Sequence, residues 1–180
     1  MCVKISLIAE LGELQNLFND YQFSQFEPIY KGNPLSKYPV LTANGIKNLQ
    51  WGEKKDTLII HHQKTDLETK KYKRGVLAIT GFYIIKKEKT YAPVGFGDHK
   101  ETIKIIPYLV KRKDDDLMML PVLLKENSFY IIMQKSNTLL QKYQKKEPLI
   151  ISKHEKWMSN SKIISKELKA FDYEISVSEF

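Results

Sequence analysis

The chain has 180 residues, a formal net charge of +8 and a pI of about 9.3. Hydrophobic residues make up 42% of it and aromatic residues 11%, which is too much apolar material for a disordered chain. No apolar run approaches the ~18 residues of a membrane-spanning helix, and the N-terminus is too short and too polar for a signal peptide. The single cysteine, Cys2, excludes an internal disulfide, so we expect a cytoplasmic protein without a membrane partner.

The positive charge favours polyanionic partners, because each contact between a basic side chain and a phosphate releases condensed counterions. Very few of the 29 basic residues are arginines. A lysine-rich composition without any nucleic-acid role is therefore the alternative explanation of the charge.

The predicted elements begin with a short strand at Cys2–Ser6 and an amphipathic helix over residues 7 to 19. The helix is predicted from apolar side chains at helical spacing: Leu7, Leu11, Leu14 and Phe18. Turn-forming residues from Glu27 to Pro34 predict a loop. Segments typical of strands then follow in quick succession: Tyr38–Thr42, Lys47–Trp51, Thr57–His61, Val76–Lys86, Ile103–Arg112, Leu117–Leu124 and Ser128–Gln134. The Asn44-Gly45 dipeptide predicts a hairpin between the first two, since both residues tolerate positive φ.

Two later connections differ in length. Lys86–Lys100 contains Pro93, Gly95 and Gly97, and we expect it to be a long mobile loop. Lys113–Asp116 links two apolar strands, and we expect it to be a solvated turn.

The C-terminal part returns to helical spacing at Ser136–Tyr143. A capping box, Ser152–Glu155, predicts a further helix that carries Trp157, and the alternating segment Phe171–Val177 predicts a closing strand. Many short strands with a few helices indicate one α+β domain over residues 1–180, with a largely antiparallel, curved or barrel-like sheet as its core.

Cys2 is the residue on which any covalent chemistry must rest. Methionine before a cysteine is usually excised, and this would place the α-amine of Cys2 beside its thiol, whereas a retained Met1 would block that amine. Reference pKa values of about 8.5 for the thiol and about 7.7 to 8.0 for the amine leave both partly deprotonated near neutral pH. Such an aminothiol forms an imine with an aldehyde and closes it to a thiazolidine, and an open-ring abasic site in DNA is such an aldehyde. The alternative is an arbitrary cysteine in a frayed terminus.

A set of short motifs runs through nearly the whole chain. In chain order they are Met1-Cys2, Tyr38-Pro39-Val40, Gln50-Trp51-Gly52, Gly81-Phe82-Tyr83, Pro148–Ser152, Trp157 and Tyr173–Ser178. No single motif is decisive, but their order and spacing, with a cysteine at position 2, resemble the SRAP family (SOS response-associated peptidases, the abasic-site-binding proteins).

The resemblance implies a DNA-damage protein that binds single-stranded DNA and abasic-site DNA, captures the abasic site through Cys2, and acts as a self-cleaving peptidase or lyase. No cofactor or metal is implied, and we expect a monomer. Lys4, Arg74 and Lys146 occupy family positions that are often arginine and contact backbone phosphates. Trp51 is interpreted either as a platform for an unstacked base or as a buried hairpin tryptophan. The basic run Lys70–Arg74 is more typical of a solvated lead-in to a strand than of a dedicated patch.

The chain departs from the family at the residues that handle protons. The family's glutamate after Gly-Phe-Tyr is Ile84 here, and its histidine before Asp-Arg-Met-Pro is Gln144, within Gln144–Pro148. The family's asparagine falls near residues 59 to 61 and aligns with no single one of them. Loss of a general acid or base costs about 10²- to 10⁴-fold in rate, so we expect cleavage and release to be impaired. Thiazolidine formation can survive, because an aminothiol reacts with aldehydes unaided, and Glu53, Glu88 or a histidine is a possible substitute acid.

Two other interpretations stay open. One is a catalytically degenerate, SRAP-derived module that binds nucleic acid or protein without covalent chemistry, which the replaced residues favour. The other is a thiol-dependent hydrolase acting on peptides, which would need a base near Cys2. A metal site at His61-His62 and Asp98-His99 is not expected, because adjacent histidines on a strand point to opposite faces.

Overall fold

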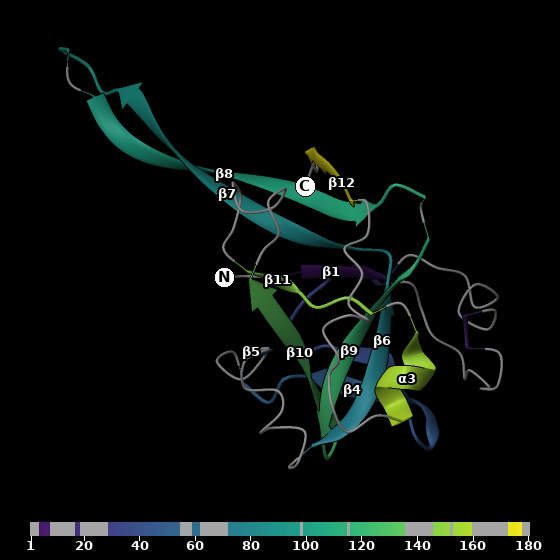
Figure 1. Ribbon diagram of the computed structural model, residues 1–180. Helices are drawn as coiled ribbons and strands as arrows, with labels where there is room; N and C mark the ends of the chain where they lie inside the picture. The colour runs from purple at the N-terminus through teal and green to yellow at the C-terminus, as the bar shows by residue number, and fades with distance from the viewer. Residues whose placement is uncertain are drawn as a thin grey trace.

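The computed structural model describes residues 4–7, 17–18, 29–54, 59–61, 72–97, 99–114, 116–135, 146–151, 153–159 and 173–177. In chain order the elements are β1 (Lys4–Leu7), β2 (Ile29–Gly32), β3 (Lys37–Thr42), β4 (Gly45–Trp51), β5 (Ile59–His61), β6 (Lys73–Ile79), β7 (Gly81–Pro93), β8 (His99–Arg112), β9 (Met118–Lys125), β10 (Ser128–Lys135), β11 (Lys146–Pro148), α3 (His154–Ser159) and β12 (Tyr173–Val177). Strands dominate these ranges (Figure 1), and no helix within them is long and apolar enough to cross a membrane.

Five strands close into a small barrel. Their order is β10-β4-β3-β6-β9, and β9 pairs back with β10. Every neighbouring pair is antiparallel except β10–β4, where Ser128 lies opposite Gln50 in a parallel ladder. The expected antiparallel, barrel-like core is therefore confirmed.

The helical half of the predicted α+β class is described only in small part. Of the predicted helix over residues 7 to 19, Leu17 is helical and Phe18 is buried, while Leu7 belongs to β1. The predicted helix Ser136–Tyr143 lies outside the described residues. The helix that carries Trp157 is present as α3.

A second sheet, in the order β12-β8-β7-β1-β2, stands against the barrel. The chain enters it at Thr80, where a bend separates β6 from β7, so the single strand predicted over Val76–Lys86 is wrong. Gly81 opens β7 for a steric reason: a Cβ there would lie 2.8 Å from the carbonyl oxygen of Val110 on β8. An apolar run on both sides of the bend hides this change of sheet from the sequence pattern.

The loop predicted over Lys86–Lys100 is also wrong. β7 and β8 stay paired from Gly81 opposite Lys111 to Pro93 opposite His99 and form a long hairpin arm. From Lys87 to Ile105 most of the described side chains are exposed on both faces, so this part of the sequence lacks the apolar alternation that identifies a half-buried strand. The loop predicted from Glu27 to Pro34 likewise contains a strand, β2, which pairs with β1.

Aromatic side chains fill the barrel. The rings of Tyr38 and Trp51 meet edge to face with centroids 6.2 Å apart, and those of Tyr38 and Phe129 with centroids 5.9 Å apart. A second buried cluster includes Phe18 and Trp157, the buried residue of α3. The Asn44-Gly45 hairpin is confirmed between β3 and β4, with Gly45 at a φ of 98°.

Candidate nucleic-acid interface

The beginning of β1 is the described part of the chain nearest in sequence to Cys2. Lys4 lies opposite Tyr83 of β7, and Ile5 lies opposite Phe82. Cys2 itself lies outside the described residues, as does Gln144. The structure thus brings the start of the chain beside the Gly-Phe-Tyr segment, and it leaves the side chain of Lys4 undescribed.

Ile84 follows this segment and points into the apolar core. It is 1% exposed and packs in the barrel cluster with Phe82 and Val110. An ionised carboxylate at this position would be buried among apolar groups, which is costly without a partner. Ile84 therefore contributes packing and cannot transfer a proton.

The two glutamates considered as substitute acids are engaged elsewhere. Glu88 forms an ion pair with Lys86 on the hairpin arm, with 2.6 Å between Nζ and Oε1. Glu53 lies 3.2 Å from the Nζ of Lys125, beyond the end of β4. Neither side chain lies at the β1–β7 pairing.

A buried carboxylate that the sequence did not single out is present in β11. Glu147 is 3% exposed, and its Oε1 accepts a hydrogen bond of 3.2 Å from Nε2 of Gln134. It follows Lys146, whose backbone lies opposite Lys135 of β10 and whose side chain is not described. The signal in the sequence was a charged residue directly before Pro148, where the resembled family carries methionine.

The guanidinium of Arg74 contacts Trp157 inside the protein. Its Nη1 donates a 2.7 Å hydrogen bond to the backbone oxygen of Trp157, and its guanidinium lies 4.2 Å from the centroid of the Trp157 ring. The indole Nε1 of Trp157 in turn donates to the oxygen of Gly75 at 2.8 Å. Arg74 therefore fastens α3 to β6, a role that the prediction of a phosphate contact did not include.

Trp51 is 1% exposed, in the barrel core, where its ring meets that of Tyr38. Burial leaves neither face of its ring open to a base. Of the two interpretations of Trp51, the structure favours the buried hairpin tryptophan.

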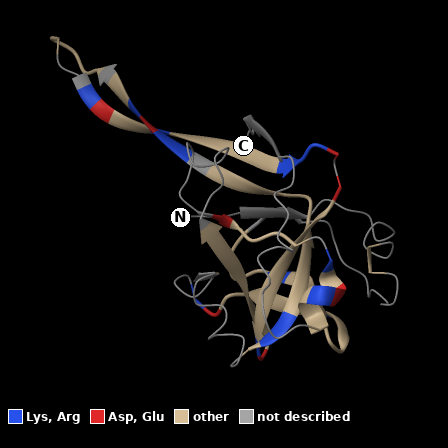
Figure 2. Ribbon diagram, viewed as in Figure 1, with Lys and Arg blue, Asp and Glu red and all other residues tan. Residues whose placement is uncertain are grey.

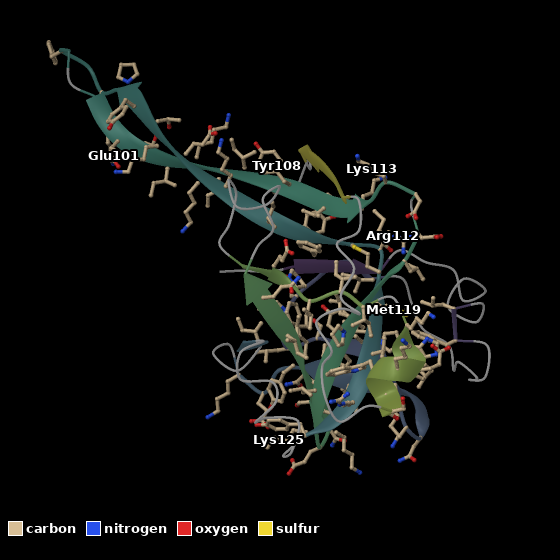
Figure 3. All side chains as sticks on the ribbon, in the orientation of Figure 1. Glu101, Tyr108, Arg112, Lys113, Met119 and Lys125 are labelled. Atoms are coloured by element: carbon tan, nitrogen blue, oxygen red, sulfur yellow. The ribbon has the colours of Figure 1, made fainter. Side chains whose placement is uncertain are left out.

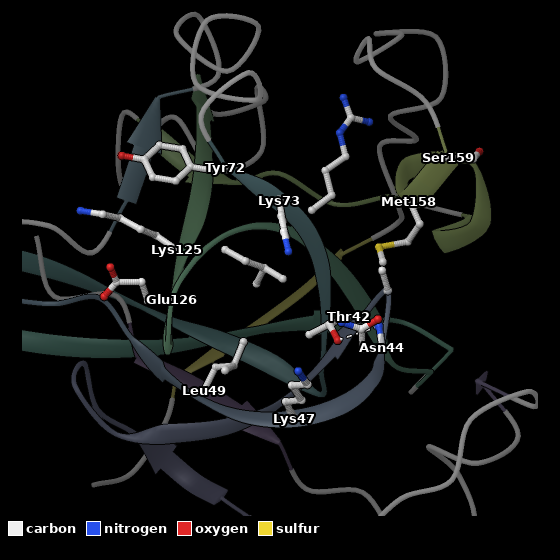
Figure 4. Close-up of a pocket in the computed structure, with 13 residues that line it drawn as sticks. Thr42, Asn44, Lys47, Leu49, Tyr72, Lys73, Lys125, Glu126, Met158 and Ser159 are labelled. Atoms are coloured by element: carbon white, nitrogen blue, oxygen red, sulfur yellow. Dashed lines mark hydrogen bonds between the residues drawn. The ribbon is translucent and has the colours of Figure 1, made fainter.

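An open groove lies at one end of the barrel (Figure 4). Four segments meet there: the β3–β4 turn, the start of β6, the β9–β10 turn and the end of α3. The space between them is about 730 Å³. Buried or half-buried apolar side chains form one part of its lining: Leu49, Leu124 and Met158. Exposed lysines and one half-buried aromatic ring form another part: Lys47, Lys73, Lys125 and Tyr72.

The β3–β4 turn, just before Lys47 on β4, is held in place by local hydrogen bonds. The Oγ1 of Thr42 donates to the oxygen of Gly45 at 2.7 Å and accepts from the backbone N–H of Asn44 at 3.2 Å. These bonds fix the hairpin end from which β4 begins, so the lysine projects from a rigid element.

Positive charge predominates around the groove, and one of its lysines, Lys125, forms an ion pair with Glu53. The hydroxyl of Tyr130 and the ammonium of Lys125 both hydrogen-bond the carboxylate of Glu53 and lower its pKa, and Glu53 raises the pKa of Lys125. Burial raises the pKa of Tyr130, so this hydroxyl stays protonated. Lys47 and Lys73 are exposed on the other sides of the groove. Figure 2 shows basic residues at this end of the barrel.

The groove and the start of β1 lie at opposite ends of β6. β6 begins at Lys73, beside the groove, and ends at Ile79, just before β7. β1 pairs with the start of β7. A strand rises about 3.3 Å per residue, so roughly 20 Å separates the two ends of β6. In Figure 3, Lys125 marks the groove end of the molecule.

The sequence singled out none of the groove lysines as site residues. Lys73 was included in a basic run interpreted as solvated, and Lys47 and Lys125 stand alone in the sequence. They come from three strands that only the barrel topology brings together. Among the described residues no group of His, Cys, Asp and Glu side chains could hold a metal ion. His62 and Asp98 lie outside them.

No protein-family model matches the sequence, and no curated protein is similar to it in sequence. Solved structures share its fold. A structural-genomics protein from Bacteroides thetaiotaomicron is 18% identical with a TM-score of 0.72, over 98% of this chain and 91% of that one. One from Bordetella bronchiseptica is 10% identical with a TM-score of 0.73, over 99% and 100% of the two chains. A phage-related protein from the same organism is 12% identical with a TM-score of 0.69, over 99% and 95%. At these identities the likeness shows a shared fold.

Proposed function

We propose that this chain binds single-stranded DNA in the groove at the end of the barrel. The observation that carries the proposal is the convergence of three lysines, Lys47, Lys73 and Lys125, on a space of about 730 Å³ with an apolar lining. Proteins that bind single strands combine a positive groove for the backbone with apolar and aromatic surfaces for the bases. Tyr72 and Leu49 supply such surfaces beside the lysines. The formal net charge of +8 adds a general attraction to polyanions.

We further propose that Cys2 captures abasic sites covalently as a thiazolidine, within a role in the response to DNA damage. This part rests on the resemblance to the SRAP family and on the pairing of Lys4 with Tyr83, beside the segment that the family uses. Because Ile84 is packed in the core and cannot move a proton, the proposal includes capture but impaired release and impaired peptidase activity. The alternative to covalent capture is a module that binds nucleic acid non-covalently, through the same groove.

A pair of charge-reversal variants tests the groove. We expect Lys47→Glu with Lys73→Glu to weaken binding of a fluorescent single-stranded oligonucleotide by about tenfold or more, and to reduce the slope of log K against log salt by about 1.4, since each phosphate contact contributes about 0.7. Lys113→Glu with Lys153→Glu is the matched control, because both lysines are exposed, lie outside the groove and give the same change in net charge. Equal losses from the two double variants would show an effect of net charge alone and contradict the groove.

The covalent step has its own test. The intact mass of the purified protein first shows whether Met1 has been removed. The processed protein is then incubated with an oligonucleotide that contains one abasic site, with Cys2→Ala as the control. We expect a slowly migrating adduct that depends on Cys2, and its absence would leave non-covalent binding alone.

A further inference from the structure

The β7–β8 hairpin extends far beyond the rest of the molecule (Figure 1). β1 pairs with β7 only from Gly81 to Tyr83, and β12 pairs with β8 only from Tyr108 to Arg112. Beyond these points, among the described residues, the two strands pair only with each other as far as Pro93 opposite His99. A two-stranded ribbon without a third strand is marginally stable in water, so a surface that covers it in a complex would stabilise it. We call the part from Lys86 to Lys104 the arm.

Apolar side chains are concentrated on the arm and its base. Within the described part of the chain, all the exposed large apolar side chains except Leu35 lie here: Tyr91, Val94, Phe96, Ile103 and Ile105. Ile103 lies opposite Lys89 and Ile105 lies opposite Lys87, so these four side chains share one face of the ribbon. Tyr91 is two residues from Lys89 and lies on the same face. The exposed apolar groups thus form a stripe along the ribbon that continues to its tip.

The tip presents one aromatic ring to solvent. Phe96 is fully exposed and has a φ of 48°, between Gly95 with a φ of 67° and Gly97 with a φ of 82°. Side chains other than glycine rarely adopt this left-handed backbone. The ring of Phe96 is therefore not buried against either core cluster of the described residues.

The charge of the arm is positive. From Lys86 to Lys104 there are five lysines and three acidic residues, a net charge of +2. Lys86 pairs with Glu88 and Lys89 pairs with Glu101, while Lys100 and Lys104 are exposed on the face opposite the apolar stripe. Figure 2 shows these alternating charges along the arm.

We propose that the arm lies in a groove of duplex DNA, with Phe96 inserted between bases at its tip and Lys87, which is exposed on the same face as the apolar stripe, against a phosphate. The major groove, about 12 Å wide, admits a two-stranded β-ribbon, and apolar side chains there contact thymine methyl groups. Apolar wedges such as phenylalanine insert between base steps in many DNA-bending proteins.

Charge and geometry favour this occupant over two others. A second copy of the chain would bring together two arms, and two molecules, of the same positive charge. A lipid surface would contact the tip alone, whereas Ile103 and Ile105 lie well below it, among charged residues. Duplex DNA is negatively charged and can enclose the whole length of the ribbon.

The inference rests on the proposed function, because it extends the DNA contacts of the same protein to a second surface. The arm is separate from the groove: Glu101, near the tip, and Lys125, at the groove, mark opposite extremes of the molecule in Figure 3. Failure of one surface can therefore be distinguished from failure of the other.

A tryptophan introduced at the tip by the substitution Phe96→Trp tests the inference. Trp51 and Trp157 are buried, so their fluorescence is separable from the red-shifted emission of an exposed indole in Phe96→Trp. We expect duplex DNA to quench this emission by stacking, and we expect Phe96→Ala to weaken duplex binding by about tenfold, a typical loss for one stacking aromatic. Asp116→Trp, an exposed site on the β8–β9 turn, is the control, and its emission should stay unchanged.

The other outcomes overturn the proposal. Duplex binding in an anisotropy assay with unchanged emission from Phe96→Trp would remove the arm from the interface. If the unaltered protein binds single-stranded DNA but not duplex DNA, the proposal for the arm is wrong and the proposal for the groove still stands. Two results would identify a different occupant if duplex DNA does not quench the emission of Phe96→Trp. A blue shift of that emission with anionic phosphatidylserine vesicles would indicate a lipid surface. Dimerisation in sedimentation velocity that Phe96→Ala abolishes would indicate a second copy of the chain.

Discussion

Arg74 shows how one side chain joins two elements. Its hydrogen bond to the oxygen of Trp157 and its position over the indole ring hold α3 against β6. We expect Arg74→Met to lower the free energy of unfolding by about 2 kcal/mol, because a charged hydrogen bond is lost and the buried oxygen is left without its donor. At this chain length the loss corresponds to a fall in Tm of roughly 4–8 °C.

Arg112→Met is the control for Arg74→Met. Arg112 pairs with Asp114, an exposed residue of the β8–β9 turn, and such exposed pairs contribute little to stability. Thermal unfolding followed by circular dichroism compares the two variants. An unchanged Tm for Arg74→Met together with weakened DNA binding would instead assign Arg74 to the phosphate contact predicted from the sequence.

If the groove binds DNA as proposed, Glu53 competes with the DNA for Lys125. Hydrogen bonds from Tyr130 and then Lys125 lower the pKa of Glu53, so the pair is formed above the ordinary pKa of a glutamate and is lost only as the pH falls through the lowered value. Near neutral pH, Glu53→Gln should therefore release Lys125 and remove one negative charge from the rim. We expect single-stranded DNA to bind about two- to fivefold more tightly, because Lys125 becomes available to a phosphate.

Glu155→Gln makes the same change of charge on the exposed side of α3 and serves as the control for Glu53→Gln. Anisotropy titrations at neutral pH measure both. Equal tightening by the two variants would show that only the net charge matters. Unchanged affinity for Glu53→Gln would place Lys125 outside the DNA contact.

At the scale of elements, the strands of the barrel were predictable and the arm was not. Barrel strands such as β3 and β10 carry continuous apolar residues, and the Asn44-Gly45 turn has a strong local preference. Most of the described side chains of the arm are exposed, so no burial pattern records it, and Pro93 and Gly97 indicated a loop where they only close a hairpin. The bend at Thr80 is similarly hidden, because both flanking strands are apolar.

The arm should be dispensable for folding. We expect a variant in which an Asn-Gly turn replaces the residues between Lys87 and Ile105, a directly opposed pair, to keep its Tm within about 4 °C, since the excised side chains bury little surface. The same variant should lose duplex binding and keep single-strand binding. Phe96→Ala keeps the full arm and is the comparison for the Tm alone, because it too is expected to weaken duplex binding.

Excision of the arm separates two explanations of its exposed apolar groups. A large fall in Tm would show that the arm stabilises the fold, and it would contradict the assignment of these groups to a ligand. Unchanged duplex binding after excision would place the duplex contact on the body of the molecule.

At the scale of the whole molecule, the candidate site combines residues that the sequence could name with residues that it could not. Cys2 and Ile84 follow from a motif of neighbours along the chain. Lys47, Lys73 and Lys125 meet only because β4, β6 and β9 close into one barrel, and no local pattern encodes that closure. The buried position of Trp51 likewise follows from its partners on other strands.

The groove and β1 lie at opposite ends of β6, which is roughly 20 Å long, and this separation gives the last prediction. If the groove binds the strand that Cys2 captures, Lys47→Glu with Lys73→Glu should raise the DNA concentration for half-maximal adduct formation by about tenfold, because phosphate contacts are lost. The rate at saturating abasic DNA should stay within about twofold, since the aminothiol chemistry needs neither lysine. A small soluble aldehyde, which needs no groove, should react with Cys2 at the same rate in both proteins. A lower rate with the small aldehyde would mean that the lysines act on Cys2 itself, and an unchanged half-maximal concentration would mean that the groove and the covalent site serve different ligands.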